Sequence, residues 1–143
     1  NKKAIKLIKN HFSSKNVIPL ELIKSPHLPS SNALHLDCCF QPVSENNAVI
    51  CKEAFKNPFE LDLLISHYGA KNVFEISPKE MSKLFSNFFS IEKNVVVSDK
   101  RFHRLNKWLG SIGVKVEKVN YSEVSKLGGL FRCSTLPLIR KKD

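Results

Sequence analysis

The sequence predicts an α/β fold in which a unit of two strands, a helix and a third strand is repeated. This order of strand-like and helix-like patterns occurs in residues 33–76 and again, less cleanly, in residues 88–119. The chain has 143 residues and 42% of them are apolar, including ten Phe and one Trp, which is enough for one hydrophobic core. No low-complexity segment or linker divides residues 1–143, so we expect a single domain.

The segment before the first repeat is expected to hold a helix and an extended stretch. Ile5, Ile8 and Phe12 recur at helical spacing, and polar residues follow them, so a short helix is expected over residues 4–12. Residues 17–23 are rich in β-formers despite one proline, which predicts a strand.

Turn and cap residues mark the first repeat clearly. Paired asparagines favour a hairpin turn, proline suits the first turn of a helix, and Gly69 suits a helix C-cap. The expected elements are a strand over residues 33–43, a turn at Asn46-Asn47, a returning strand over 48–55, a helix from Pro58 to about Tyr68 and a strand over 73–76.

The second repeat follows a helix-start signature, Ser77-Pro78-Lys79-Glu80. We expect this brief helix to end at about Phe85. The elements expected after it are an extended region over residues 88–97, a helix capped by Ser98 or Asp99 that runs through Trp108 to about Ile112, a strand over 114–119, a short helix over 122–127 and an apolar strand around Cys133.

The chain is strongly basic, with 23 Lys and Arg against 13 Asp and Glu and a formal net charge of +10. An anionic partner is therefore one interpretation, and a nucleic-acid or acidic-protein binding module is the alternative function. The basic groups in question are Lys100, Arg101, His103, Arg104, Lys107, Lys115, Lys118, Lys126, Arg140, Lys141 and Lys142. Because no aromatic residue is interleaved for base stacking, we expect a solvated helix face with Leu105, Trp108 and Leu109 turned inward, and no nucleic-acid binding.

Neither a membrane span of about 18 apolar residues nor a secretory leader is visible, so we expect a soluble, cytoplasmic protein that does not bind a membrane. The four cysteines include an adjacent pair and form no CxxC motif, which favours reduced thiols. His11, His27 and His67 have no metal-ligand spacing, so no metal site is expected.

His35 and Asp37 are candidate site residues on the strand expected over residues 33–43. Strand alternation would place both, with Cys39, on one face, and Leu34, Leu36, Cys38 and Phe40 on the other. A carboxylate beside an imidazole raises the imidazole's basicity, as a general acid and base requires. The alternative is that both side chains simply lie on the solvated face of an antiparallel strand.

Cys133 is the candidate nucleophile. The Gly128-Gly129 pair lets the backbone approach a ligand, Arg132 can stabilise a thiolate, and Ser134-Thr135 places hydroxyls in an apolar run. The alternative is a small buried hydrophobe. A cysteine nucleophile suits several reactions, but the carboxylate of Asp37 favours a cationic substrate such as a guanidinium.

These two motifs resemble the C-terminal half of the guanidine-modifying superfamily, which includes arginine deiminases, dimethylarginine dimethylaminohydrolases and amidinotransferases. The resemblance rests on His35-Leu36-Asp37 followed by Phe40 and Pro42, and on Gly128-Gly129 through Arg132-Cys133 to Thr135, Pro137-Leu138 and Arg140. It spans nearly the whole chain. It implies part of a pentein-type α/β propeller of ββαβ units, about two and a half of five, with no cofactor.

The resemblance also implies roles for the candidate residues. Cys133 would attack the guanidinium carbon to give a thiouronium adduct, and His35 would protonate the leaving group and then activate water or an amine acceptor. Asp37 and Arg132 would be substrate-binding residues. Because dimethylarginine hydrolases do not all keep the aspartate, Asp37 favours the deiminase and amidinotransferase branches.

The chain departs from the family pattern on its N-terminal side. Members carry further acidic substrate ligands before the histidine, whereas Glu21 is the only acidic residue before Asp37 here. We therefore expect the N-terminal half to be absent, or present in cis or as another chain, and the isolated 143-residue chain to be inactive. A non-catalytic propeller scaffold and a homo-oligomer remain open alternatives.

Overall fold

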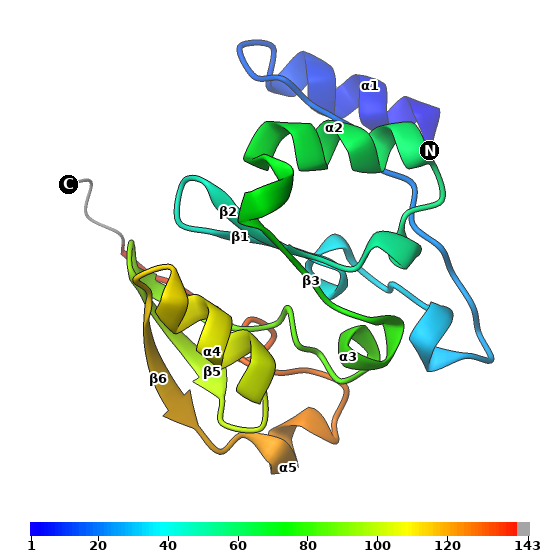
Figure 1. Ribbon diagram of the computed structural model, residues 1–143. Coiled ribbons are helices and arrows are strands. Elements are labelled where there is room, and N and C mark those ends of the chain that lie inside the picture. The colour runs from blue at the N-terminus through cyan, green and yellow to red at the C-terminus, as the bar shows by residue number, and fades with distance from the viewer. Residues whose placement is uncertain (140–143) are drawn as a thin grey trace.

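The computed structural model describes residues 1–139, which form two three-stranded sheets with the same topology (Figure 1). In each sheet the first two strands pair antiparallel and the third pairs parallel with the second. The strands are β1 (Phe40–Val43), β2 (Asn47–Ile50) and β3 (Val73–Glu75) in one sheet, and β4 (Phe89–Glu92), β5 (Val95–Asp99) and β6 (Lys115–Val119) in the other.

One helix crosses from the second to the third strand in each sheet, as parallel pairing requires. The α-helices are α1 (Lys2–His11), α2 (Pro58–Tyr68), α3 (Pro78–Ser82), α4 (His103–Ser111) and α5 (Ser122–Ser125). Short 3-10 turns span Pro29–Ser31, Leu36–Cys38, Lys52–Ala54 and Ala70–Asn72. Figure 1 shows α2 beside the first sheet and α4 across the second, so the order ββαβ occurs twice in the described residues.

Local signals place both ends of α2 and the start of α3 where they were expected, although α3 ends at Ser82 rather than near Phe85. The side chain of Asn57 accepts a hydrogen bond from the Phe59 amide, Pro58 occupies the first turn of α2, and Gly69 ends the helix at φ 78°. Ser77 and Glu80 form a complete capping box at the start of α3. These cap predictions are confirmed. They were possible because a helix cap depends only on residues close to it in sequence.

The core joins both sheets to the helices. Val49 and Ile50 of the first sheet, and Leu105 and Leu109 of α4, are fully buried, as is Phe88. The predicted inward face of α4 is thereby confirmed. Among residues 1–139, no helix has the length and apolar character needed to cross a membrane.

Several predicted strands were wrong or too long. The strand expected over residues 48–55 ends at Ile50, and a 3-10 turn follows at Lys52–Ala54. Residues 17–23 form only an isolated bridge between Leu22 and Phe55. The strand expected over residues 33–43 begins only at Phe40, because the Cys38 and Cys39 amides bond back to the carbonyls of His35 and Leu36 and close a 3-10 turn. The region 88–97 is not one extended segment but the β4–β5 hairpin.

Asp99 was expected as a cap for α4 but belongs to β5. Its carboxylate is fully buried and accepts hydrogen bonds from Arg101 Nε (2.9 Å) and Nη2 (2.8 Å), and from the Tyr121 amide (3.3 Å). Burial raises the pKa of Asp99, but the bonds from Arg101 and Tyr121 outweigh burial, so the pKa lies below its usual value. Asp99 therefore connects β5 to the chain just before α5.

We expect Asp99→Asn to destabilise the fold by about 2 kcal/mol at pH 7, because it removes charge-assisted bonds from a buried site. A lowered folded-state pKa contributes stability above the unfolded value of about 3.9, and this contribution is lost as the pH falls through the folded value. The variant should therefore lose less stability than the wild type on acidification below about pH 4. Urea unfolding at both pH values measures this, with the exposed Glu123→Gln as control. Equal acid dependence of Asp99→Asn and wild type would contradict it.

Candidate active site

The two predicted catalytic segments are both turns rather than strands. His35 precedes the 3-10 turn Leu36–Cys38, and the two-face pattern expected from strand alternation is wrong: Leu34 is 60% exposed while Cys39 is fully buried. The turn nevertheless gathers polar groups, since ligand atoms of His35, Asp37 and Cys38 lie within 4.8 Å of one another. These three side chains are also of types that bind metal ions. The histidine spacing in the sequence did not reveal this cluster.

Cys133 lies in a turn that is fixed by its neighbours. Leu130 and Phe131 are buried, and the Ser134 amide bonds to the Leu130 carbonyl at 3.2 Å. The hydroxyls of Ser134 and Thr135 donate to the backbone carbonyls of Leu130 and Phe131, so they close the turn locally. These bonds explain why the expected strand does not form here.

The Gly128-Gly129 pair serves the cysteine itself. A Cβ built on Gly129 would lie 2.8 Å from the Cys133 Cβ and 3.4 Å from its sulfur, and Gly128 has φ 83°. Only glycine therefore fits at 129 without moving Cys133, and Gly128 adopts a backbone conformation that glycine favours. A cavity of about 290 Å³ adjoins this pair and Cys133.

Ser86 and Asn87, which the sequence prediction missed, join the two turns. The buried Ser86 hydroxyl lies 2.8 Å from the Asp37 carbonyl oxygen and 2.6 Å from that of Cys38. Asn87 Nδ2 donates to Cys133 Sγ at 3.3 Å, and Asn87 Oδ1 accepts from the Arg132 amide at 2.9 Å. The signal that could have found them is a polar pair enclosed by Phe85 and Phe88.

The structure brings the two motifs together directly. Arg132 Nε lies 3.9 Å from Asp37 Oδ2, with both side chains partly exposed. Cys38 has Asp37 and Cys133 among its electrostatic neighbours. Residues far apart in sequence thus meet around Ser86 and Asn87, with a guanidinium already against Asp37.

The four free thiols differ sharply in environment. Burial raises the pKa of Cys39 and of Cys51 to about 12, with nearby Cys38 and Glu53 adding to the effect respectively. Burial is also the main cause of the raised pKa of Cys38. Cys133 is the one exposed thiol of the four, all of which lie in the described residues. Exposure thus favours Cys133 as the reactive cysteine.

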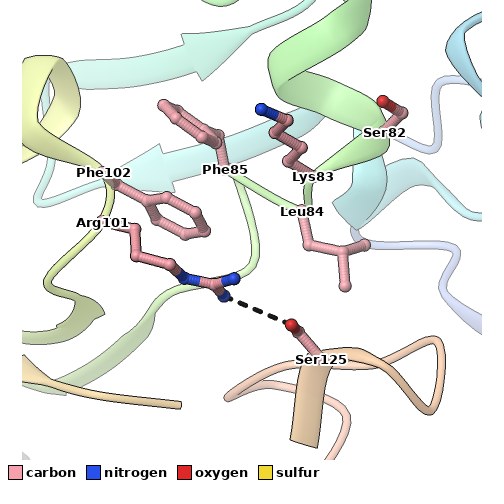
Figure 2. A pocket seen from close by; sticks show the side chains of 7 residues that line it. All are labelled: Ser82, Lys83, Leu84, Phe85, Arg101, Phe102 and Ser125. Atoms are coloured by element: carbon pink, nitrogen blue, oxygen red, sulfur yellow. Dashed lines mark hydrogen bonds between the residues drawn. The ribbon is translucent and has the colours of Figure 1, made fainter. Parts of the chain in front are cut away.

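A second cavity, of about 360 Å³, lies beside the segment that follows α3 (Figure 2). Figure 2 shows Leu84 and Phe85 of this segment facing Arg101, Phe102 and Ser125. Arg101 Nη2 donates to Ser125 Oγ at 3.2 Å. A smaller cavity, about 190 Å³, shares Leu84 and Ser125 with it and extends to Cys38 and Gly128. Cavities therefore lie against residues 82–85 and against Cys38 and Gly128 of the candidate site.

Two arginines near the start of α4 make contacts within the chain. Arg101 pairs with Asp99 (2.8 Å), and Arg104 pairs with Glu80 (2.6 Å) and lies 4.3 Å from the Phe74 ring centroid. Both guanidinium groups are therefore held against other parts of the chain. Arg140 of the C-terminal motif, and Lys141 and Lys142 of the basic set, lie outside the described residues.

Curated relatives match this chain over part of their length. The uncharacterized protein YkgA of Bacillus subtilis (strain 168) is 36% identical over 107 residues, covering 75% of this chain and 36% of the relative. An arginine deiminase of Latilactobacillus sakei is 37% identical over 67 residues, covering 47% of this chain and 16% of the relative. The chain therefore spans well under half the length of these relatives.

Solved structures share the fold at low identity. The N-terminal domain of the cyanobacterial arginine dihydrolase ArgZ, in a point variant covalently bound to a reaction intermediate, matches with a TM-score of 0.74 and 19% identity, covering 90% of this chain and 44% of that one. SxtG, an amidinotransferase from Microseira wollei, matches with a TM-score of 0.72 and 18% identity, covering 100% and 40%. The α/β fold is thus that of pentein dihydrolase and amidinotransferase domains.

A family model assigns the chain more closely. The model for eukaryotic N,N dimethylarginine dimethylhydrolase matches residues 1–140. This is the branch that Asp37 did not favour, whereas the solved structures are those of an arginine dihydrolase and an amidinotransferase. With a match over almost its whole length, the chain belongs to the eukaryotic N,N dimethylarginine dimethylhydrolase family, within the guanidine-modifying superfamily.

Proposed function

We propose that this chain carries the cysteine side of an active site that acts on the guanidinium group of arginine or a methylated arginine. The observation that carries the proposal is the meeting of the exposed Cys133 thiol with the His35–Asp37 turn across Ser86 and Asn87. The Arg132 guanidinium, 3.9 Å from Asp37, illustrates the kind of cation that this carboxylate can hold.

The chemistry follows from the roles of these groups. The Cys133 thiolate adds to the guanidinium carbon, and the tetrahedral adduct expels ammonia or an amine that takes a proton from His35. A thiouronium remains on the sulfur. His35 then removes a proton from an attacking water, and the second tetrahedral adduct collapses to a ureido product and the free thiolate. Attack by an amine in place of water would make the enzyme an amidinotransferase.

Asp37 and Arg132 both belong to the substrate-binding part of the site in this proposal. Asp37 accepts hydrogen bonds from guanidinium nitrogens and holds the carbon in line with the sulfur. Arg132 lies next to the nucleophile in sequence and against Asp37 in space, so it balances the carboxylate's charge until substrate arrives. The reaction uses only protein groups and water, and the family model favours a dimethylarginine hydrolase over a transferase.

The rest of the site is proposed to lie in sequence that this chain does not contain. Relatives and solved structures are more than twice as long as the matched part. We propose that an N-terminal half, in cis or as another chain, supplies further carboxylates and the remaining units of a five-unit propeller. Residues 1–143 alone would then be inactive. The comparisons give no support to a nucleic-acid module or a scaffold.

The test uses the full-length protein, assayed separately with L-arginine and with Nω,Nω-dimethylarginine. We expect release of ammonia or dimethylamine with formation of a ureido product. We also expect an acid-quenched adduct on the peptide that contains Cys133. The isolated 143-residue chain serves as the matched control and should give neither product nor adduct. The proposal would be rejected if the full-length protein consumed neither substrate, or if no adduct formed on Cys133.

A further inference from the structure

Asn87 touches the nucleophile and its neighbour at once. Its side chain is only 1% exposed, and it spans from the Cys133 sulfur (3.3 Å) to the Arg132 backbone amide (2.9 Å). A buried amide must satisfy its polar atoms, so both contacts are needed for the asparagine to be accommodated.

The chemistry of the amide fixes which end meets the sulfur. The Arg132 N–H can only donate, so it requires the oxygen of Asn87. A flipped amide would set two donors against each other at Arg132. The NH2 group is thereby directed at Cys133, where an N–H donor stabilises a thiolate more than a neutral thiol.

The backbone that carries Asn87 is itself held by neighbouring residues. The backbone N–H of Asn87 donates to the Leu84 carbonyl at 2.9 Å. Leu84 has a left-handed φ of 65°, a conformation that a bulky residue adopts only when its surroundings impose it. Phe85 packs on Phe102 with ring centroids 4.1 Å apart, and Figure 2 shows both rings, with Leu84, lining the second cavity. The turn over residues 84–87 is therefore fixed by its own contacts, and it holds the Asn87 side chain against the Cys133 sulfur.

We propose that Asn87 is a positioning residue that stabilises the Cys133 thiolate and fixes its direction. The catalytic consequence rests on the proposed function, but the effect on the thiol does not. Ser86, the residue before Asn87, contacts the carbonyl oxygens of Asp37 and Cys38. The segment Ser86-Asn87 therefore positions both Cys133 and the turn that carries His35.

The test measures the rate of Cys133 alkylation by iodoacetamide against pH, read by peptide mass spectrometry on the full-length protein. In Asn87→Ala we expect the midpoint of the profile to rise by roughly one pH unit, so that alkylation well below the midpoint slows about tenfold. In Asn87→Asp, which keeps the acceptor for Arg132 but adds negative charge, the rise should be larger. Asn106→Ala is the matched control, because Asn106 is also buried but bonds to the Asp99 carbonyl.

The profile separates positioning from a merely structural role. Loosening of the turn would change the plateau rate at high pH and the melting temperature, but not the midpoint. An unchanged midpoint in either Asn87 variant, with circular dichroism showing a folded protein, overturns the inference. Because alkylation needs no turnover, a protein that is inactive on guanidines but shows the shifted midpoint would reject the proposed function and leave this inference standing.

Discussion

Cys133→Ser is expected to leave the full-length protein without detectable turnover of arginine or dimethylarginine, a loss of at least about 10⁴-fold in kcat. A serine hydroxyl is a far weaker acid than a thiol, and the proposed mechanism requires the anion to add to the guanidinium carbon. Substrate binding should survive, since Asp37 is unchanged. Steady-state kinetics and calorimetric binding of arginine to the variant measure the two effects separately.

Selective labelling provides the companion measurement. A haloacetamidine, which carries an amidinium that Asp37 can hold, should modify Cys133 first. At pH 8 a thiol with a pKa of about 12 is ionised to roughly one part in 10⁴, so Cys39 and Cys51 should stay unmodified in the folded protein. Cys38→Ser is the matched control, because Cys38 lies beside the site but burial raises its pKa. Equal labelling of all four thiols, or normal turnover by Cys133→Ser, would reject Cys133 as the nucleophile.

The boundaries of α2 and the start of α3 were predictable because they depend on neighbouring residues, whereas the start of α4 was not. Pro58 and Gly69 set the limits of α2, and the Ser77–Glu80 capping box starts α3. Such caps act over three or four residues, which a sequence displays directly. The chemistry proposed for the site was predicted instead from the resemblance of two motifs to a known superfamily. No local sequence pattern predicted the contacts that these residues make.

The geometry of the site could not be read from periodicity. Alternation suggested a strand at His35, but the backbone closes a 3-10 turn, with Cys39 buried under it and Leu34 exposed. Ser86 and Asn87 act on residues 45 to 49 positions away. Contacts over such separations are set by packing of whole elements, so their polar partners emerge only when the fold brings them together.

His35→Ala is expected to lower kcat for arginine-type substrates by about 10²- to 10⁴-fold, because the leaving amine loses its proton donor and water loses its base. The Cys133 alkylation profile should change far less, since Asn87 rather than His35 is placed against the sulfur. Steady-state kinetics of the full-length protein measure the effect. His27→Ala, an exposed histidine in the preceding loop, is the control and should retain wild-type activity.

A substrate with a better leaving group separates the two proposed roles of His35. In an S-methylisothiourea analogue of arginine the departing methanethiolate needs no proton, so the first step should proceed in His35→Ala. The thiouronium should then accumulate, because its hydrolysis still requires a base, and intact-mass analysis should show the adduct on Cys133. Rapid release of product from this variant would assign base catalysis to another group, and a missing adduct would indicate that His35 acts before the sulfur attacks.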